Sequence, residues 1–267
     1  MSVSTSPPPA PHPLYNTTYT LHTLTPLHNL PAPTALAPHA RRLLNQLRAS
    51  TLRGVDLAPA NTPAARTGAL QQCTWTPLPV PHAGLQLTLA YEHQTYAALF
   101  LGDGPHYPLL LTRMPAAQRA ALVAFLAAEF DTLPLPLALP DALLRVAVNC
   151  YVGATRGARG GEVALSFAPR VGAPALKRVA ITVASEDVHG FWQRGESGGG
   201  FLGALGAHLE EAVGLRVHEV DLVKVALGGF VLASEGKAKF CAGDGAVEEV
   251  IALVMQEAAG RGKWGQK

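Results

Sequence analysis

The chain has 267 residues and is 48% hydrophobic, enough for one large domain or two smaller ones with sizeable cores. Its net charge of only +2 gives no overall sign of a polyanion partner, and no apolar run is long enough to span a membrane. Cys73, Cys150 and Cys241 lie too far apart for a disulfide or zinc framework, and the N-terminus lacks a secretory signal, so we expect an intracellular protein.

The first segments alternate between extended and helical patterns. Residues 1–13 are rich in proline and are predicted to form a disordered arm. A strand is expected over 14–24, followed by an amphipathic helix over 35–49. Short apolar runs between turn residues then predict a series of strands, of which 84–91 shows the cleanest alternation. The expected strands are 51–57, 69–78, 84–91, 96–102 and 107–112.

Two proline-initiated helices close the first half, over 115–131 and 140–152. The basic, glycine-rich sequence "GATRGARGG" follows and marks a soft boundary. We therefore expect a disordered arm, two α+β sub-domains and a flexible tail. Their predicted bounds are 1–13, 14–153, 154–259 and 260–267.

The second half repeats the mixture of strands and helices. The pattern predicts two strands, two helices, a long strand that turns back at a Gly-Gly bend, and a closing helix. Because the strands do not alternate regularly with helices, the expected fold class is α+β with a largely antiparallel sheet. The predicted elements cover 162–169, 175–184, 185–193, 200–213, 216–233, 237–242 and 246–259.

Residues 195–199, "GESGG", match the G-x-S-x-G pattern of a hydrolase nucleophile elbow. That elbow needs a buried strand directly before the serine, but the apolar strand ends at Ala184. His208 follows Ser197 with no acid between them, and the acids before His218 belong to the helix that Ser197 itself opens. We therefore interpret the stretch as the start of the helix over 200–213.

Other catalytic and ligand-binding patterns are weak. A phosphate-binding P-loop is excluded because no lysine lies between Lys177 and Lys224. The ten histidines are scattered without metal-ligand spacing and are expected at surface positions or strand ends. The sequence therefore predicts no enzyme, no catalytic residue, no cofactor and no metal.

The sequence from Val220 to Phe240 is long, β-prone and lightly charged. Simple alternation places Leu222 and Lys224 on one face and Val223 and Val225 on the other, so both faces are largely apolar. This pattern suits a strand buried within a sheet. It also suits an edge that pairs with a partner chain by strand addition, or with a second copy of this chain.

Basic residues gather between residues 145 and 178, where six Lys and Arg stand against Glu162 alone, a local net charge of +5. A further basic group lies on the helix of 35–49. Both groups are candidates for contact with DNA phosphates, although such segments are also often solvated faces. The DNA-facing candidates are Arg41, Arg42, Arg48, Arg156, Arg159, Arg170, Lys177 and Arg178.

Several whole segments resemble the fungal members of the CENP-L family of inner-kinetochore subunits. They are "HPLYNTTYTLHTLTPLH", "HARRLLNQLRASTLRGVDL", "GALQQCTWTPLP" and "VKVALGGFVLASEGKAKF", in the family's order. The resemblance runs from about residue 13 to residue 240 and does not rest on a short chemical signature. It implies a curved antiparallel sheet with helices packed on one side.

The resemblance also implies a function. It points to a non-catalytic scaffold subunit of the constitutive centromere-associated network, in the nucleus at the centromere and kinetochore. Such a subunit pairs with a CENP-N-like protein by extending a C-terminal β-sheet, contacts other inner-kinetochore subunits, and helps bind centromeric DNA and CENP-A nucleosomes in chromosome segregation. The residues placed at the partner interface are Val220, Leu222, Val223, Val225, Leu227, Phe230, Leu232 and Phe240.

Two alternatives remain beside this one. The first is a stand-alone nucleic-acid-binding protein that uses Arg156, Arg159 and Arg170. The second is a hydrolase with Ser197 as its nucleophile. Binding of DNA by the isolated chain distinguishes the first from a scaffold, and labelling of Ser197 by a fluorophosphonate probe identifies the second.

Overall fold

A computed structural model describes residues 12–53, 67–104, 106–157, 161–170, 178–196, 198–241 and 244–260. It confirms an α+β fold built on a largely antiparallel sheet. The predicted arm, apart from residues 12 and 13, and the predicted tail, apart from residue 260, lie outside the described residues.

The strands form one continuous sheet in the order β2-β3-β4-β5-β1-β11-β10-β9-β7-β8, with β6 pairing beside β11 on β1. Every strand pair is antiparallel. β1 joins the two halves of the sheet because it pairs with β5 on one edge and β11 on the other. The strands are β1 Thr17–Thr23, β2 Leu70–Pro77, β3 Gly84–Tyr91, β4 Thr95–Asp103, β5 His106–Arg113, β6 Leu135–Pro136, β7 Val163–Pro169, β8 Val179–Val183, β9 Val220–Ala226, β10 Phe230–Ala233 and β11 Lys237–Phe240.

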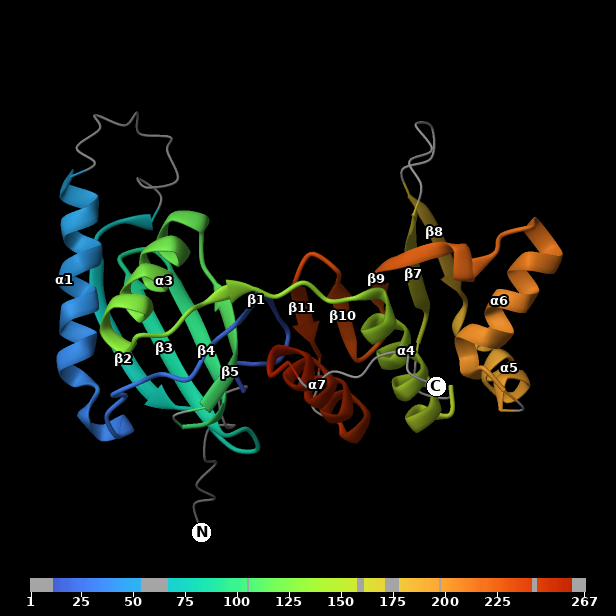
Figure 1. Cartoon of the computed structure of the whole chain (residues 1–267), viewed down its shortest axis with the longest axis horizontal. Coiled ribbons are helices and arrows are strands. Elements are labelled where there is room, and N and C mark those ends of the chain that lie inside the picture. The colour runs from blue at the N-terminus through green and yellow to red at the C-terminus, as the bar shows by residue number, and fades with distance from the viewer. Residues whose placement is uncertain are drawn as a thin grey trace, which may run out of the picture.

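The helices divide between the two halves of the sheet, with α1 and α3 at one end of the molecule and α4 to α7 toward the other (Figure 1). The strand expected at 51–57 is wrong for residues 51–53, which extend α1, and residues 54–57 lie outside the described part. The bounds are α1 Ala37–Arg53, α3 Ala116–Phe130, α4 Asp141–Thr155, α5 Ser185–Gly195, α6 Gly200–Val213 and α7 Gly245–Ala258.

Two hydrophobic cores lie on opposite faces of the sheet. Leu109 and Leu111 of β5 point into one core, which α4 to α7 cover, whereas Leu110 between them points into the other, which α1 and α3 cover. Successive side chains of a strand alternate between faces, so these two sets cannot share one side. The expectation that all helices pack on one side is therefore wrong.

The halves of the chain and the halves of the sheet do not coincide. α4, at the end of the predicted first sub-domain, packs against β9, α6 and α7 of the second. β6 lies in the segment between α3 and α4, which crosses from one half of the molecule to the other in Figure 1. The boundary between residues 153 and 154 stays a prediction, but the sheet runs through both proposed sub-domains without a break.

The alternation predicted for the long strand fails at a β-bulge. Ser166 of β7 pairs with Lys224, but the next residue, Phe167, pairs with Leu222, so Val223 is an extra residue on β9. A bulge of this kind shifts the side-chain phase by one position. Leu222 and Val225 consequently both point into the core, and the assignment of Leu222 and Lys224 to one face is wrong.

Candidate interaction surfaces

The glycine-rich stretch joins two helices. α5 ends at Gly195 and α6 begins at Gly200, so a helix, not a strand, precedes the turn, and Ser197 itself lies outside the described residues. The Oδ1 atom of Asn149 on α4 accepts the backbone N–H of Leu202 at 3.0 Å and thus satisfies one of the free donors of the first turn of α6. The prediction that this stretch opens the helix over 200–213 is confirmed.

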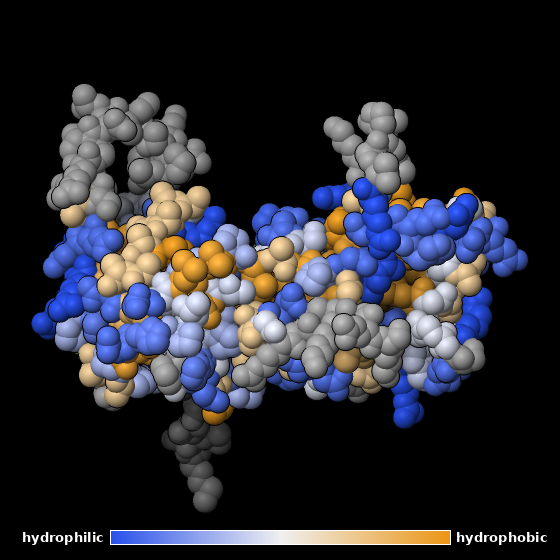
Figure 2. Space-filling view, in the orientation of Figure 1, coloured by the Kyte–Doolittle hydropathy of each residue, from blue (hydrophilic) through white to orange (hydrophobic). Residues whose placement is uncertain are grey.

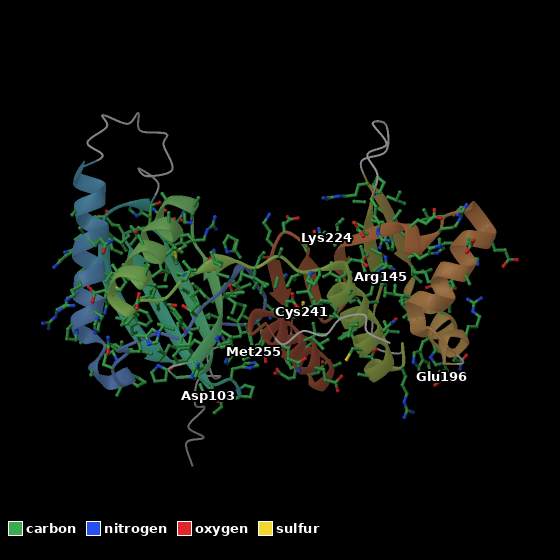
Figure 3. All side chains as sticks on the ribbon, viewed as in Figure 1. Asp103, Arg145, Glu196, Lys224, Cys241 and Met255 are labelled. Carbon is green, nitrogen blue, oxygen red and sulfur yellow. The ribbon has the colours of Figure 1, made fainter. Side chains whose placement is uncertain are left out.

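Most acidic and histidine side chains in the described part of the chain lie apart from one another, except around Tyr15, whose hydroxyl contacts His82 and Glu248. Asp103 lies at the β4–β5 turn and Glu196 at the end of α5, far apart in Figure 3. No group of His, Cys, Asp and Glu among the described residues could hold a metal ion. His22 lies one residue before the end of β1, as the strand-end expectation allows, but it is buried and its Nδ1 atom has no hydrogen-bond partner.

The hairpin that was predicted to offer an edge lies inside the sheet. β9 pairs with β7 and β10, β10 with β9 and β11, and β11 with β10 and β1. From Lys224 to Phe240 intramolecular partners already occupy both edges of these strands, which leaves no place for a further strand there. Val220 and Val223 are half-buried, and the other predicted interface residues are buried in this chain: Leu222, Val225, Leu227, Phe230, Leu232 and Phe240.

The beginning of β9 extends past β10, and side chains of α4 cover its backbone. The carboxylate of Asp141 accepts the N–H of Leu222 at 2.6 Å, and Arg145 donates to the carbonyls of Val217 at 3.0 Å and Val220 at 2.8 Å. Arg145 is itself held by Asp141 at 2.8 Å. Figure 3 shows Arg145 and Lys224 close to this strand. The open part of β9 is thus closed to a further strand.

The outer edge of β2 is covered in a similar way. The guanidinium of Arg48 on α1 donates to the carbonyl of Leu70 at 2.9 Å and to that of Gln71 at 3.3 Å. α1 also packs beside β2 along this edge. Arg48 therefore satisfies backbone acceptors of an edge strand that would otherwise be free to bind a partner.

The arginines proposed as DNA contacts do not form one patch. Arg42 pairs with Glu129 at 2.8 Å and Arg48 covers β2, whereas Arg170 pairs with Asp221 at 2.7 Å at the other end of the sheet. Arg156 caps α4 in the left-handed conformation, and Arg178 is exposed just before β8. Arg41 is also exposed on α1; Arg159 and Lys177 lie outside the described residues.

A cationic face that the sequence analysis missed lies on the C-terminal half of the sheet. Ala233 of β10 pairs with Lys224 on one side and Lys237 on the other, so these lysines point to the same face. Lys239 follows two residues later on that face. The core is on the opposite face, where Leu232 and Ala238 are buried under the helices. The sequence did contain one signal for this surface: the alternation Lys-Ala-Lys in 237–239 places Lys237 and Lys239 on the same face of a strand.

Most side chains around these lysines are small, although Val231 lies opposite Lys239 and Glu235 forms an ion pair with Lys237 at 3.1 Å. The small side chains include Ala164 and Ser166 of β7, Ala226 of β9 and Ala180 of β8, which share the lysine face by register. With strands about 4.8 Å apart, Lys224 and Lys237 are roughly 10 Å from each other, and Lys237 and Lys239 roughly 7 Å. We call Lys224, Lys237 and Lys239 the lysine face. Lys224 and Lys237 are exposed, and Lys239 is half-buried.

A polar cluster connects the two halves of the molecule at the β2–β3 turn. The hydroxyl of Tyr15 donates to Glu248 of α7 at 2.5 Å and lies 3.0 Å from Nε2 of His82 in that turn. Burial, followed by the hydrogen bond to Glu248, raises the pKa of Tyr15. Burial lowers the pKa of His82, although Glu248 opposes this effect. Both pKa shifts favour the neutral forms, the Tyr15 hydroxyl and the uncharged His82 ring.

The surface is more hydrophilic at the two ends of the molecule than in its middle. Hydrophilic residues gather along α1 and around α5 and α6, and apolar residues show at the segment between α3 and α4 (Figure 2). Leu133 and Leu135 of that segment are 56% and 49% exposed. None of the described helices combines the length and apolar character needed to cross a bilayer.

Comparison with known proteins identifies a family that matches this chain. The model of a protein family described as "CENP-L: Centromere protein L" matches residues 13–259. The match begins just before β1 and ends just after α7, so it includes every helix and strand in the described part of the chain. No curated protein matches the sequence.

Proposed function

The chain belongs to the CENP-L, centromere protein L, family, and we propose that it acts there as a non-catalytic scaffold subunit. Membership of the family supports a role at the centromere and kinetochore in chromosome segregation, and hence a place in the nucleus. The observation that carries the proposal is the family match over nearly the whole chain. The glycine-rich turn joins two helices and follows no strand, which agrees with a structural role.

We further propose that the subunit pairs with a CENP-N-like protein by extending its C-terminal sheet. The hairpin of β9 to β11 does not contact the partner strand in this arrangement. It forms the centre of the half of the sheet that the partner would extend. Within the described part of the chain β8 pairs with β7 alone, so β8 is the free edge of that half. The partner strand would therefore add at residues 179–183 and not at residues 220–240.

The lysine face is the surface that we propose for centromeric DNA. In α5, α6 and α7 seven acidic residues stand against Arg194 alone, a net charge of −6 on the helical side of this half. Lys224, Lys237 and Lys239 lie on the opposite side. A polyanion is repelled by the helical side and attracted by the sheet side, so the charge distribution orients the DNA on the bare sheet.

Co-expression with the CENP-N-like protein of the same organism tests the pairing. We expect the two chains to purify as a complex of one copy each, with the mass measured by light scattering. Recovery of only the separate chains would contradict the pairing. DNA binding by the isolated chain at the strength of the complex would favour the stand-alone nucleic-acid-binding alternative.

The DNA surface is tested in the complex with the triple variant Lys224→Gln, Lys237→Gln and Lys239→Gln. Each lost phosphate contact lowers the slope of log K against log salt by about 0.9, so we expect a weaker and less salt-dependent affinity for duplex DNA. Arg113→Gln, Arg194→Gln and Arg216→Gln together remove the same charge at exposed positions outside both sets of DNA-facing candidates and serve as the control. Equal losses in the two triple variants would show only a non-specific charge effect and reject the lysine face.

A further inference from the structure

A groove of about 480 Å³ runs between the start of α1 and the edge strand β2. Arg48 covers the backbone of β2 at Leu70 and Gln71, and the groove lies further along the same strand, from Cys73 to Pro77. At about 3.3 Å per residue, this part of β2 is roughly 13 Å long. The groove therefore has the length of an extended segment of about five residues.

Proline and aromatic side chains line this groove. Pro33 and Pro77 are exposed, and the half-buried indole of Trp75 packs against Phe100 with their ring centroids 5.2 Å apart. The Nε1 atom of Trp75 is buried without a hydrogen-bond partner in the described part of the chain, and the exposed Arg41 also lines the groove. Indole and guanidinium groups only donate hydrogen bonds. The groove consequently fits an apolar ligand that brings carbonyl acceptors.

A proline-rich segment in the polyproline II conformation has these properties. Each proline has an apolar ring and a carbonyl group but no backbone N–H. Proteins that recognise such segments bind them in grooves lined by aromatic side chains, and the preformed helix keeps the entropy cost of binding low. This chain contains such a segment in residues 5–11, which read TSPPPAP.

The structure holds the end of this segment beside the groove. Nε2 of His12, the residue that directly follows it, donates to the carbonyl of Pro79 at 2.9 Å, two residues beyond Pro77. Two extended residues span about 7 Å, so the last two residues of the segment are sufficient to reach from Pro79 to Pro77. Residues 5–9 then remain, and at 3.1 Å per residue in polyproline II they cover about 12 Å of the groove.

We propose that this groove binds the chain's own proline-rich segment, with residues 5–9 lying along β2 and their carbonyls facing Trp75 and Arg41. The segment runs parallel to β2, because its C-terminal end lies nearest to Pro77 and its N-terminal end nearest to Cys73. A tilt of the indole toward the groove lets Nε1 donate, a side-chain change of the kind that binding commonly brings. This contact goes beyond the proposed function, which places the partner and the DNA on the C-terminal half of the sheet.

The indole N–H signal of Trp75 in nuclear magnetic resonance spectra of the full chain reports on the groove, and Trp75→Phe identifies it. The triple variant Pro7→Ser, Pro8→Ser and Pro9→Ser removes the apolar rings of the segment. We expect the indole signal to move and its hydrogen exchange with water to become about tenfold faster. Ser4→Ala, just outside the docked residues, is the control and should change neither. An indole signal that is the same in the triple variant and the unaltered chain would overturn the proposal.

A fluorescent peptide with the sequence of residues 1–11 tests where the segment binds. A short tether keeps the arm near the groove at an effective concentration of about 1 mM, so the peptide should bind the triple proline variant about tenfold more tightly than the unaltered chain. In the triple variant, Ala37→Phe fills the groove and should abolish binding. Ala49→Phe, at an exposed position further along α1, should retain it, and thermal unfolding shows that both variants are folded.

Three results of these measurements would reject the proposal. Equal affinity of the peptide for the unaltered chain and the triple variant would leave the groove to a proline-rich segment of another protein. Peptide binding that is indifferent to Ala37→Phe would reject the groove itself. A Trp75 signal that changes on dilution would place the arm in the groove of a second copy. None of these results affects the co-expression experiment or the test of the lysine face.

Discussion

His22 shows how a single residue can be misjudged from a correct strand. It lies in "TYTLH", residues 18–22, where threonines and the histidine alternate with Tyr19 and Leu21, and this pattern is typical of a strand with one wet face. In the structure α3 covers that face, and His22 is only 5% exposed. The polar positions of β1 were predicted in phase, but their burial depends on a helix about a hundred residues away.

The burial of His22 predicts a pH dependence of stability. Desolvation and the nearby Arg119 lower its pKa from 6.5 in the folded chain, despite backbone hydrogen bonds that oppose the shift. The unfolded chain therefore takes up the proton first as the pH falls, so stability present above about pH 6.5 is lost below it. Burial also lowers the pKa of His82, which adds to the same loss.

Urea unfolding between pH 5 and pH 8 measures this effect. His22→Leu removes one of the titrating groups, so the free energy of unfolding should fall less steeply below about pH 6.5 than in the unaltered chain. His218→Gln is the control, since His218 is 72% exposed and should leave the pH dependence unchanged. Parallel curves for the unaltered chain and His22→Leu would contradict the assignment.

Individual elements were predicted well where local pattern decides them. The helices at Ala116–Phe130 and Gly200–Val213 and the strand at Gly84–Tyr91 agree with the expected ranges, because each has its own periodicity and its own boundary residues. The two-residue β6 and the bulge at Val223 were missed. Both depend on the register of a neighbouring strand, which no local pattern encodes.

The predicted partner interface depends on information of the same kind. The apolar hairpin was correctly recognised as strongly β-forming, but sequence alone does not give the order of strands in a sheet. Whether β9 has a free edge is decided by β7, which comes before it in the chain, and by two side chains of α4. The lysine face likewise emerges only when β10 places Lys224 and Lys237 on a common surface.

Removing the cover over β9 should cost stability. Asp141→Ala leaves the N–H of Leu222 without its acceptor and releases Arg145 from its carboxylate. A hydrogen bond to a charged group contributes about 1.5–3 kcal/mol, so the free energy of unfolding in urea should fall by about that amount. Asp141 is partly exposed, and water reaching the freed N–H moves the loss toward the lower end of the range.

Arg216→Ala is the matched control for this element. Arg216 forms an ion pair with Glu219 at 2.6 Å near the start of β9, but both side chains are 55% exposed. Exposed pairs contribute about 0.2–1 kcal/mol, so this variant should stay close to the unaltered chain. If Asp141→Ala were no more destabilising than Arg216→Ala, the cover over β9 would have no energetic role.

At the scale of the whole molecule, the two cores share one sheet. β4 and β5 supply alternate side chains to each core, and the cluster of Tyr15, His82 and Glu248 links the β2–β3 turn to α7. Unfolding one core exposes the back of strands that form the floor of the other. We therefore predict a single cooperative transition for both halves, as in a small single domain.

Two single-tryptophan chains report on the halves separately. Trp75 packs against the core under α1 and α3, and Trp192 against the core under α4 to α7, so each is retained in turn while the remaining tryptophans become Phe. The urea midpoints read from the two fluorophores should coincide. Leu122→Ala creates a cavity in the first core and should lower stability by about 2–5 kcal/mol.

The decisive measurement is the urea midpoint reported by the tryptophan in the core that does not carry the substitution. If the shared strands couple the cores, Leu122→Ala shifts the midpoint seen by Trp192 as far as that seen by Trp75, and Leu205→Ala in the other core does the same in reverse. Two separate midpoints, or a shift confined to the near fluorophore, would show that the halves unfold independently. In that case the boundary predicted after residue 153 would mark a true division in stability, because β1 and the polar cluster would be too weak to transmit unfolding.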